Sequence, residues 1–134
     1  MSAQAIRRGV RISPRKVGVV AALVRGRTIS DALVILGHTP RHAALEVKEA
    51  VKSAGANAEH NHQYKPDTLF ITEISVTPGP RLKRWKKGRG YRGGMDPFAR
   101  KTSHIRVVVD GQKRVPKKAT AKATSTEKTE EENK

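Results

Sequence analysis

Cations, aromatic residues and glycines are interleaved in one stretch of the sequence, residues 81–101. The stretch holds nine Lys and Arg residues against one acid, Asp96, and three of the five aromatic residues of the chain. Lysine and arginine neutralise phosphates and aromatic rings stack on bases, so this mixture indicates contact with nucleic acid. The candidate contact residues here are Arg81, Lys83, Arg84, Trp85, Lys86, Lys87, Arg89, Tyr91, Arg92, Arg100 and Lys101.

The charge of the remaining chain points to the same class of partner. The 134 residues carry a formal net charge of +16, and residues 1–111 hold 21 basic and eight acidic residues, a net of +13. A compact domain with this charge repels itself, so a polyanionic partner is expected. A second group of candidate contacts surrounds the first predicted helix and consists of Arg7, Arg8, Arg11, Arg15, Lys16, Arg25 and Arg27.

Other classes of function find little support in the sequence. The chain has no cysteine, which excludes disulfides and thiolate metal sites. No apolar run approaches the roughly 20 residues of a membrane span, and the first residues lack the apolar segment of a secretion signal, so a cytosolic protein is expected. Glu59, His60 and His62 suggest a metal-dependent nuclease, but the carboxylates outside the tail show no ligand spacing. We therefore expect no catalytic residue, no metal and no cofactor.

Helix signals occupy the first half of the chain. Serine or threonine followed by proline is typical of a helix start, and glycine of a helix end. The predicted helices are residues 13–26, which open on Ser13 and Pro14, residues 28–36, capped by Ser30, and residues 39–59, which open on Thr39 and Pro40. Gly55 falls within the small apolar stripe of the third helix, which indicates that something packs very close to it.

Two β-branched segments, residues 69–77 and 105–109, predict strands, the first with Phe70, Thr72, Ile74 and Val76 on one face. Residues 6–12 predict a third strand at a sheet edge, where its arginines stay in water. The linking segment between the two clear strands is too long for a structureless loop in so small a domain. It predicts a hairpin at about 78–104 whose strands run beyond the core.

Domain organisation follows from composition. Residues 1–111 predict one globular RNA-binding domain that includes the hairpin. Residues 112–134 contain one valine and no other large apolar side chain. Such a segment cannot bury enough surface to offset the entropy of ordering, so we expect a disordered tail.

Several blocks of sequence stand in the order seen in the large-subunit ribosomal protein twenty-two family, over roughly residues 5–110. The most specific are Ala56-Asn57-Ala58-Glu59-His60-Asn61 and Lys101-Thr102-Ser103-His104-Ile105, and Ser13-Pro14-Arg15-Lys16-Val17 precedes them. The resemblance implies an α+β fold in which three helices pack on a small antiparallel three-stranded sheet, with one long projecting β-hairpin. It also adds RNA-contact candidates from the matching blocks, namely Asn57, His60, Asn61, Thr102, Ser103 and His104.

The resemblance implies a structural function. Family members bind large-subunit rRNA, support early subunit assembly and line the peptide exit tunnel with the hairpin, as monomers within the cytoplasmic ribosome. The hairpin tip would lie near large-subunit protein four and the nascent peptide. In this chain the tip corresponds to Gly88, Arg89, Gly90, Tyr91, Arg92, Gly93 and Gly94.

A second hypothesis is a histone-like architectural DNA-binding protein with β-arms, in which Met95, Pro97 and Phe98 insert into the minor groove. It requires a dimer, and the sequence shows no bulky exposed apolar stripe on which to build one. A gel shift that compares duplex DNA with structured rRNA, combined with sedimentation, would separate the two hypotheses.

The charge distribution predicts a strong salt dependence of RNA binding. Since each neutralised phosphate releases counterions, a log–log plot of affinity against salt should have a slope of about −0.7 to −0.9 per phosphate contacted. Titrations of large-subunit rRNA at several salt concentrations measure this slope. A flat response would mean that charge neutralisation does not drive binding.

Overall fold

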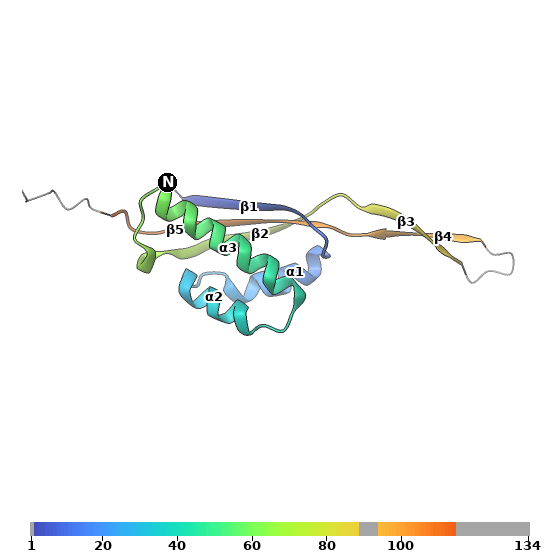
Figure 1. Cartoon of the computed structure of the whole chain (residues 1–134), viewed down its shortest axis with the longest axis horizontal. Coiled ribbons are helices and arrows are strands. Elements are labelled where there is room, and N and C mark those ends of the chain that lie inside the picture. Colours follow the sequence, from blue (N-terminus) through green and yellow to red (C-terminus); the bar gives the residue numbers. More distant parts are fainter. Residues whose placement is uncertain (1, 89–93, 115–134) are drawn as a thin grey trace, which may run out of the picture.

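The computed structural model describes residues 2–88 and 94–114. Its elements are β1 (Ala3–Val10), α1 (Pro14–Val24), α2 (Ile29–His38), α3 (His42–His60), a short 3-10 helix (Pro66–Thr68), β2 (Phe70–Pro78), β3 (Leu82–Lys87), β4 (Met95–Arg100) and β5 (Ser103–Asp110) (Figure 1). Residues 89–93 of the predicted tip and residues 115–134 of the predicted tail lie outside the described residues.

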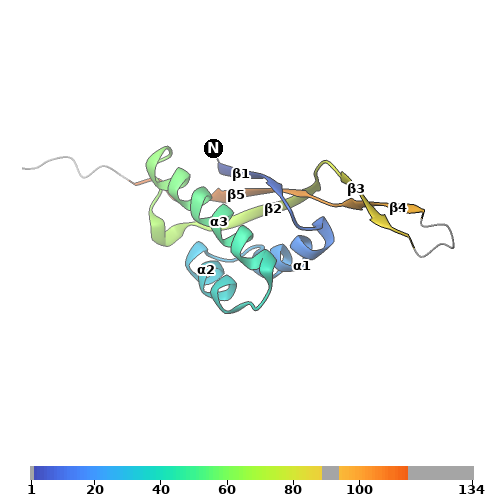
Figure 2. The same ribbon diagram turned by 45° about the vertical axis from the view of Figure 1, so that its right-hand side comes forward.

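Strand β5 lies at the centre of an antiparallel three-stranded sheet with the order β1-β5-β2. In Figures 1 and 2 the three helices lie on one side of this sheet, which makes a two-layer architecture. The predicted α+β class, with three helices and an antiparallel sheet, is confirmed.

Small aliphatic side chains form the core between these two layers. The inward face of β5 contributes Ile105, Val107 and Val109, which are completely buried. The small stripe of α3 lies against it, and Gly55 lies so close to α2 that an added Cβ would be 3.2 Å from the Ile29 side chain. The close approach predicted at Gly55 is therefore observed.

The helix boundaries correct two sequence predictions. Thr28, not Ser30, caps α2, because its Oγ1 accepts a hydrogen bond from the Asp31 amide at 3.2 Å. Thr39 does not start α3 either, since its hydroxyl donates to the Ile35 carbonyl at 2.7 Å and thus ends α2. A hydroxyl next to a turn can serve the helix before it or the helix after it, and local sequence does not distinguish the two.

The face prediction for β2 is wrong at its first residues. The pairing register with β5 shifts between Ile71 and Glu73, which leaves Thr72 as an extra residue. Such an irregularity turns the side chains on its two sides to different faces. Ile71 and Ile74 are therefore both buried, while Phe70 is 44% exposed and does not contribute to the core.

Strand β1 begins three residues earlier than the predicted residues 6–12 and ends at Val10. Its register with β5 shifts between Arg7 and Val10, where Gly9 has a φ of +73°. This left-handed conformation favours glycine. The Gly9 amide donates to Nδ1 of His104 at 3.0 Å, which ties the end of β1 to β5.

Strands β3 and β4 form a separate antiparallel pair that continues β2 and β5. All their residues are exposed, and in both views they lie beyond the helices (Figures 1 and 2). The joint between the sheet and this pair is held by two hydrogen bonds: the Gly79 amide donates to the Thr102 carbonyl at 2.9 Å, and the Thr102 hydroxyl donates to the Pro80 carbonyl at 2.7 Å. Strands β3 and β4 together form a two-stranded ribbon.

The joint has no room for a side chain at Gly79. An added Cβ would lie 2.5 Å from Oγ1 of Thr102 and 3.1 Å from Nε2 of His104. We expect Gly79→Ala to destabilise the protein by about 1–3 kcal/mol, the usual cost of overpacking, because the hydroxyl must leave its hydrogen bond. Denaturant unfolding followed by circular dichroism measures this change.

Gly18→Ala in α1 is the matched control for that substitution. Nothing lies within 4 Å of a Cβ added at Gly18, so alanine should stabilise α1 by about 1 kcal/mol through helix propensity. If both variants changed stability in the same direction, the crowding assigned to the joint would be wrong.

Candidate nucleic-acid interface

Strand alternation divides the ribbon side chains into two faces. Directly paired residues of an antiparallel pair lie on the same face, and successive residues alternate. One face carries Leu82, Arg84, Lys86, Asp96, Phe98 and Arg100, and the other carries Lys83, Trp85, Lys87, Met95, Pro97 and Ala99. Each face therefore combines cations with one aromatic ring.

The second of these faces is the better platform for stacking. Trp85 is paired with Pro97 and lies between Lys83 and Lys87 along β3. The Trp85 side chain is 63% exposed and that of Met95 is 72% exposed. A large apolar surface between two cations suits a base whose flanking phosphates reach the lysines.

The first face carries the only acid of the ribbon. Asp96 is paired with Lys86, while Arg84 is paired with Phe98. No ion pair of Arg84, Lys86 or Arg100 is present in the described part of the chain. Their charges therefore remain available to an external anion.

The joint also gathers cations that are distant in sequence. Arg15 from α1, Arg81 before β3 and Lys101 after β4 line one cavity of about 210 Å³, together with Thr102 and Gly79. All three cations are exposed. The structure thus connects the core group of predicted contacts to the ribbon group.

Arg7 is not a free cation, although the sequence analysis placed it among the RNA contacts. Its Nε is paired with the Glu46 carboxylate and its Nη1 lies 2.6 Å from the Glu49 carboxylate, both on α3. The side chain is only partly exposed. Its role is to hold β1 against α3, whereas the neighbouring Arg8 is exposed without an ion pair in the described residues.

The block Thr102-Ser103-His104 also has a structural role. Ser103 is completely buried and Thr102 is 5% exposed, so neither side chain reaches a partner outside the fold. His104 accepts the Gly9 amide hydrogen bond. The Thr102 hydroxyl thus holds the joint and the Ser103 side chain is enclosed by the fold, while the half-buried His104 stays a predicted RNA contact. Asn57 is similar, because its Nδ2 donates to the Gln4 carbonyl at 2.9 Å.

Two further arginines, Arg25 and Arg27, lie between α1 and α2, where the main chain pairs with β2. Arg25 donates through Nη2 to the Ile74 carbonyl at 3.1 Å, and Arg27 donates through Nε to the Leu23 carbonyl at 3.1 Å. Each of them retains unused guanidinium donors. Both residues are exposed, so they can still contact phosphate.

The end of α3 forms a smaller group. His60 and Asn61 are exposed there, and Asn61 lines a hollow of about 300 Å³ with His62, Gln63, Lys113 and Arg114. Residues 112–114, which the sequence assigns to the tail, pair here: the Lys65 amide donates to the Gln112 carbonyl and the Arg114 amide donates to the Gln63 carbonyl. This pairing adds Lys113 and Arg114 to the basic surface.

Sequence reasoning missed two residues at the start of α3. Arg41 and His42 line a cavity of about 510 Å³ with Arg11, Ile12, Ser13, Lys16 and Ala43. No local signal links residues 41–42 to 11–16, because the contact arises from the packing of α1 against α3.

Metal and membrane chemistry receive no support from the described residues. Within residues 2–88 and 94–114, no three His, Asp or Glu side chains gather in a way that could hold a metal ion. In the same part of the chain, each helix is too short or too polar to span a bilayer.

A two-layer α+β domain with an exposed cationic ribbon has the charge distribution of a nucleic-acid-binding protein. The sequence pattern of the family described as ribosomal protein L22p/L17e matches residues 5–110. The chain belongs to this family, whose members are ribosomal proteins of the large subunit and have a structural rather than an enzymatic role. Membership favours the ribosomal hypothesis over the architectural DNA-binding one.

Similar proteins are closely related over most of the chain. The large ribosomal subunit protein uL22 of Herpetosiphon aurantiacus is 46% identical over 110 residues, which cover 82% of this chain and 96% of that protein. The protein of the same name from Desulfitobacterium hafniense is 50% identical over 107 residues, with 80% and 92% covered. That of Clostridium tetani is 45% identical over 112 residues, with 81% and 96% covered.

Substitutions of the adjacent arginines Arg7 and Arg8 of β1 should distinguish a structural role from an RNA-binding role. Arg7→Gln removes both contacts to α3 and should lower the free energy of unfolding by about 1 kcal/mol or less, since solvent screens partly exposed pairs. Arg8→Gln should leave stability unchanged and weaken RNA binding. Denaturant unfolding of both variants measures the first effect, and equal stability of the two would contradict the role assigned to Arg7.

Proposed function

We propose that this protein is a structural component of the large ribosomal subunit that binds large-subunit rRNA, supports early subunit assembly and lines the peptide exit tunnel. Its place is the ribosome in the cytoplasm, as for the bacterial relatives. Family membership supports the assignment to the large ribosomal subunit. The exposed cations of the ribbon support the contact with RNA.

The observation that carries the proposal is that every residue of β3 and β4 is exposed. A two-stranded ribbon is marginal in water because neither face is buried, and here cations on both faces repel one another. An external polyanion that packs on both faces would bury them and would also neutralise the repulsion between the cations. We infer that β2 and β3, and β4 and β5, form one long hairpin that projects into folded RNA.

The core and the ribbon have different tasks in this proposal. The domain of residues 1–111 positions the protein through the exposed cations around α1 and at the joint, including Arg11, Arg15 and Lys16. The ribbon then threads between RNA segments, where phosphate neutralisation lets those segments pack together. The residues from Gly88 to Gly94 would form tunnel wall, close to large-subunit protein four and the nascent peptide.

Two ribbon variants test the proposal. In the shaft variant, Lys83, Arg84, Lys86 and Lys87 are changed to glutamine, and in the turn variant residues 88–95 are deleted. The deletion removes two cations, and its described residues, Gly88, Gly94 and Met95, are not buried, so the domain should still fold and enter the large subunit. The shaft variant should bind rRNA more weakly, because it loses up to four phosphate contacts and their counterion release.

Both variants are checked for helix content and titrated with large-subunit rRNA at one salt concentration. Lys48→Gln with Lys52→Gln is a control for lost charge on α3, away from the ribbon. The turn variant should instead alter tunnel behaviour, measured as macrolide sensitivity of cells that carry it. Loss of RNA binding by the turn variant, with normal binding by the shaft variant, would show the assignment of roles to be wrong.

A further inference from the structure

The cavity between the start of α1 and the start of α3 is a recess on the core, and Ser13 in its wall also lines the cavity at the joint. Its volume is about 510 Å³, within the range of about 300–1,000 Å³ that small-molecule sites occupy. Its wall comes from three places in the sequence: residues 11–13 after β1, Lys16 in the first turn of α1, and residues 41–43 at the start of α3.

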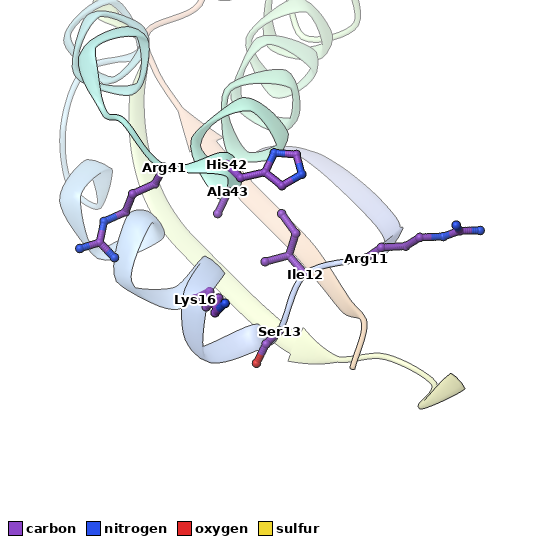
Figure 3. A pocket seen from close by; sticks show the side chains of 7 residues that line it. All are labelled: Arg11, Ile12, Ser13, Lys16, Arg41, His42 and Ala43. Atoms are coloured by element: carbon purple, nitrogen blue, oxygen red, sulfur yellow. The ribbon is translucent and has the colours of Figure 1, made fainter. Parts of the chain in front are cut away.

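The lining has an apolar floor and a basic rim. Ala43 is buried and Ile12 is partly buried, while Arg11, Lys16 and Arg41 are exposed. Figure 3 shows the Arg41 and Arg11 side chains on opposite sides of the cavity, extending away from each other, with Ile12 and the His42 ring between them.

The rim cations have no anionic partner within residues 2–88 and 94–114. Ion pairs in the described residues involve Arg7 alone, with Glu46 and Glu49. The first turn of α3 contains no acidic residue, and neither does that of α1. The three cations around the apolar floor can therefore bind an anion that also presents an apolar face.

We propose that this cavity binds one nucleotide of the RNA that has left its base stack. The base lies on Ile12 and Ala43 and stacks on the His42 ring, while the phosphates on its two sides reach Arg11 and Arg41, and Lys16 contacts either one. This inference rests on the proposed function, since it takes RNA as the partner.

An unstacked nucleotide matches the lining better than a peptide or a continuous duplex does. A duplex hides its base faces and presents phosphates on a convex surface, so it cannot fill a recess. An acidic peptide would satisfy the rim but would leave the floor of Ile12 and Ala43 in water. Proteins commonly read RNA at loops and bulges, where free bases stack on aromatic or histidine side chains.

The test compares an RNA hairpin that carries a single-nucleotide bulge with the same hairpin without the bulge. The full chain should bind the bulged hairpin about tenfold more tightly, the order expected for one stacked base. His42→Ala and Arg41→Gln should each reduce this ratio toward one. Lys52→Gln, an exposed cation of α3 outside the cavity, should weaken both complexes equally and keep the ratio.

A second measurement locates the base. Adenosine 5′-monophosphate should shift the backbone amide resonances of residues 11–13, 15–16 and 41–43, and ribose 5-phosphate should shift them much less because it lacks the base. Equal binding of the two hairpins, or an unchanged ratio in His42→Ala, would overturn this inference while leaving the proposed function intact. Failure to bind either hairpin, with rRNA also unbound, would overturn both.

A competition experiment tests whether the cavity binds an acidic peptide instead of a nucleotide. An Asp-rich peptide that displaces the bulged hairpin and shifts the same amides, when adenosine 5′-monophosphate does not, would identify the cavity as a protein-binding site and contradict the proposal.

Discussion

The main-chain pairing of β5 with β1 and β2 builds the sheet that carries both the helices and the ribbon. On one side β5 pairs with β1 and on the other with β2, and its inward residues Ile105, Val107 and Val109 are completely buried under the helices. Three residues join β2 to β3 and two join β4 to β5, so the sheet limits the direction in which the ribbon can extend. The Gly79–Thr102 contacts then transmit that direction across the joint.

Electrostatics explains why so much positive charge is compatible with a folded domain. Two of its acids, Glu46 and Glu49, hold Arg7 between β1 and α3. The ribbon carries its cations on strands that extend away from the helices (Figure 2), while Arg15, Arg81 and Lys101 bring the core and ribbon groups together at the joint. Distance and water reduce repulsion between exposed charges, so the core tolerates a field that attracts a polyanion.

The candidate interface is a set of surfaces of different character. The ribbon offers flat faces with Trp85 and Phe98, the joint gathers Arg15, Arg81 and Lys101, and the cavity at α3 is a recess with a basic rim. Flat platforms suit stacking and phosphate tracking, whereas a recess suits a single extruded group. The three surfaces therefore suit both paired and unpaired parts of the RNA partner that we propose.

The sequence by itself determined the elements and the chemistry. Pro14 marked the start of α1, the small stripe of α3 with Gly55 indicated close packing, and residues 81–101 indicated a nucleic-acid partner, since propensity, periodicity and charge are local properties. Tertiary structure alone decided which polar groups remain available. Arg7, Ser103 and Asn57 are occupied or buried by residues distant in sequence, Phe70 is turned outward by a register shift, and Arg41 joins Arg11 only because α1 packs against α3. Those outcomes depend on strand register and helix packing, which local patterns do not encode.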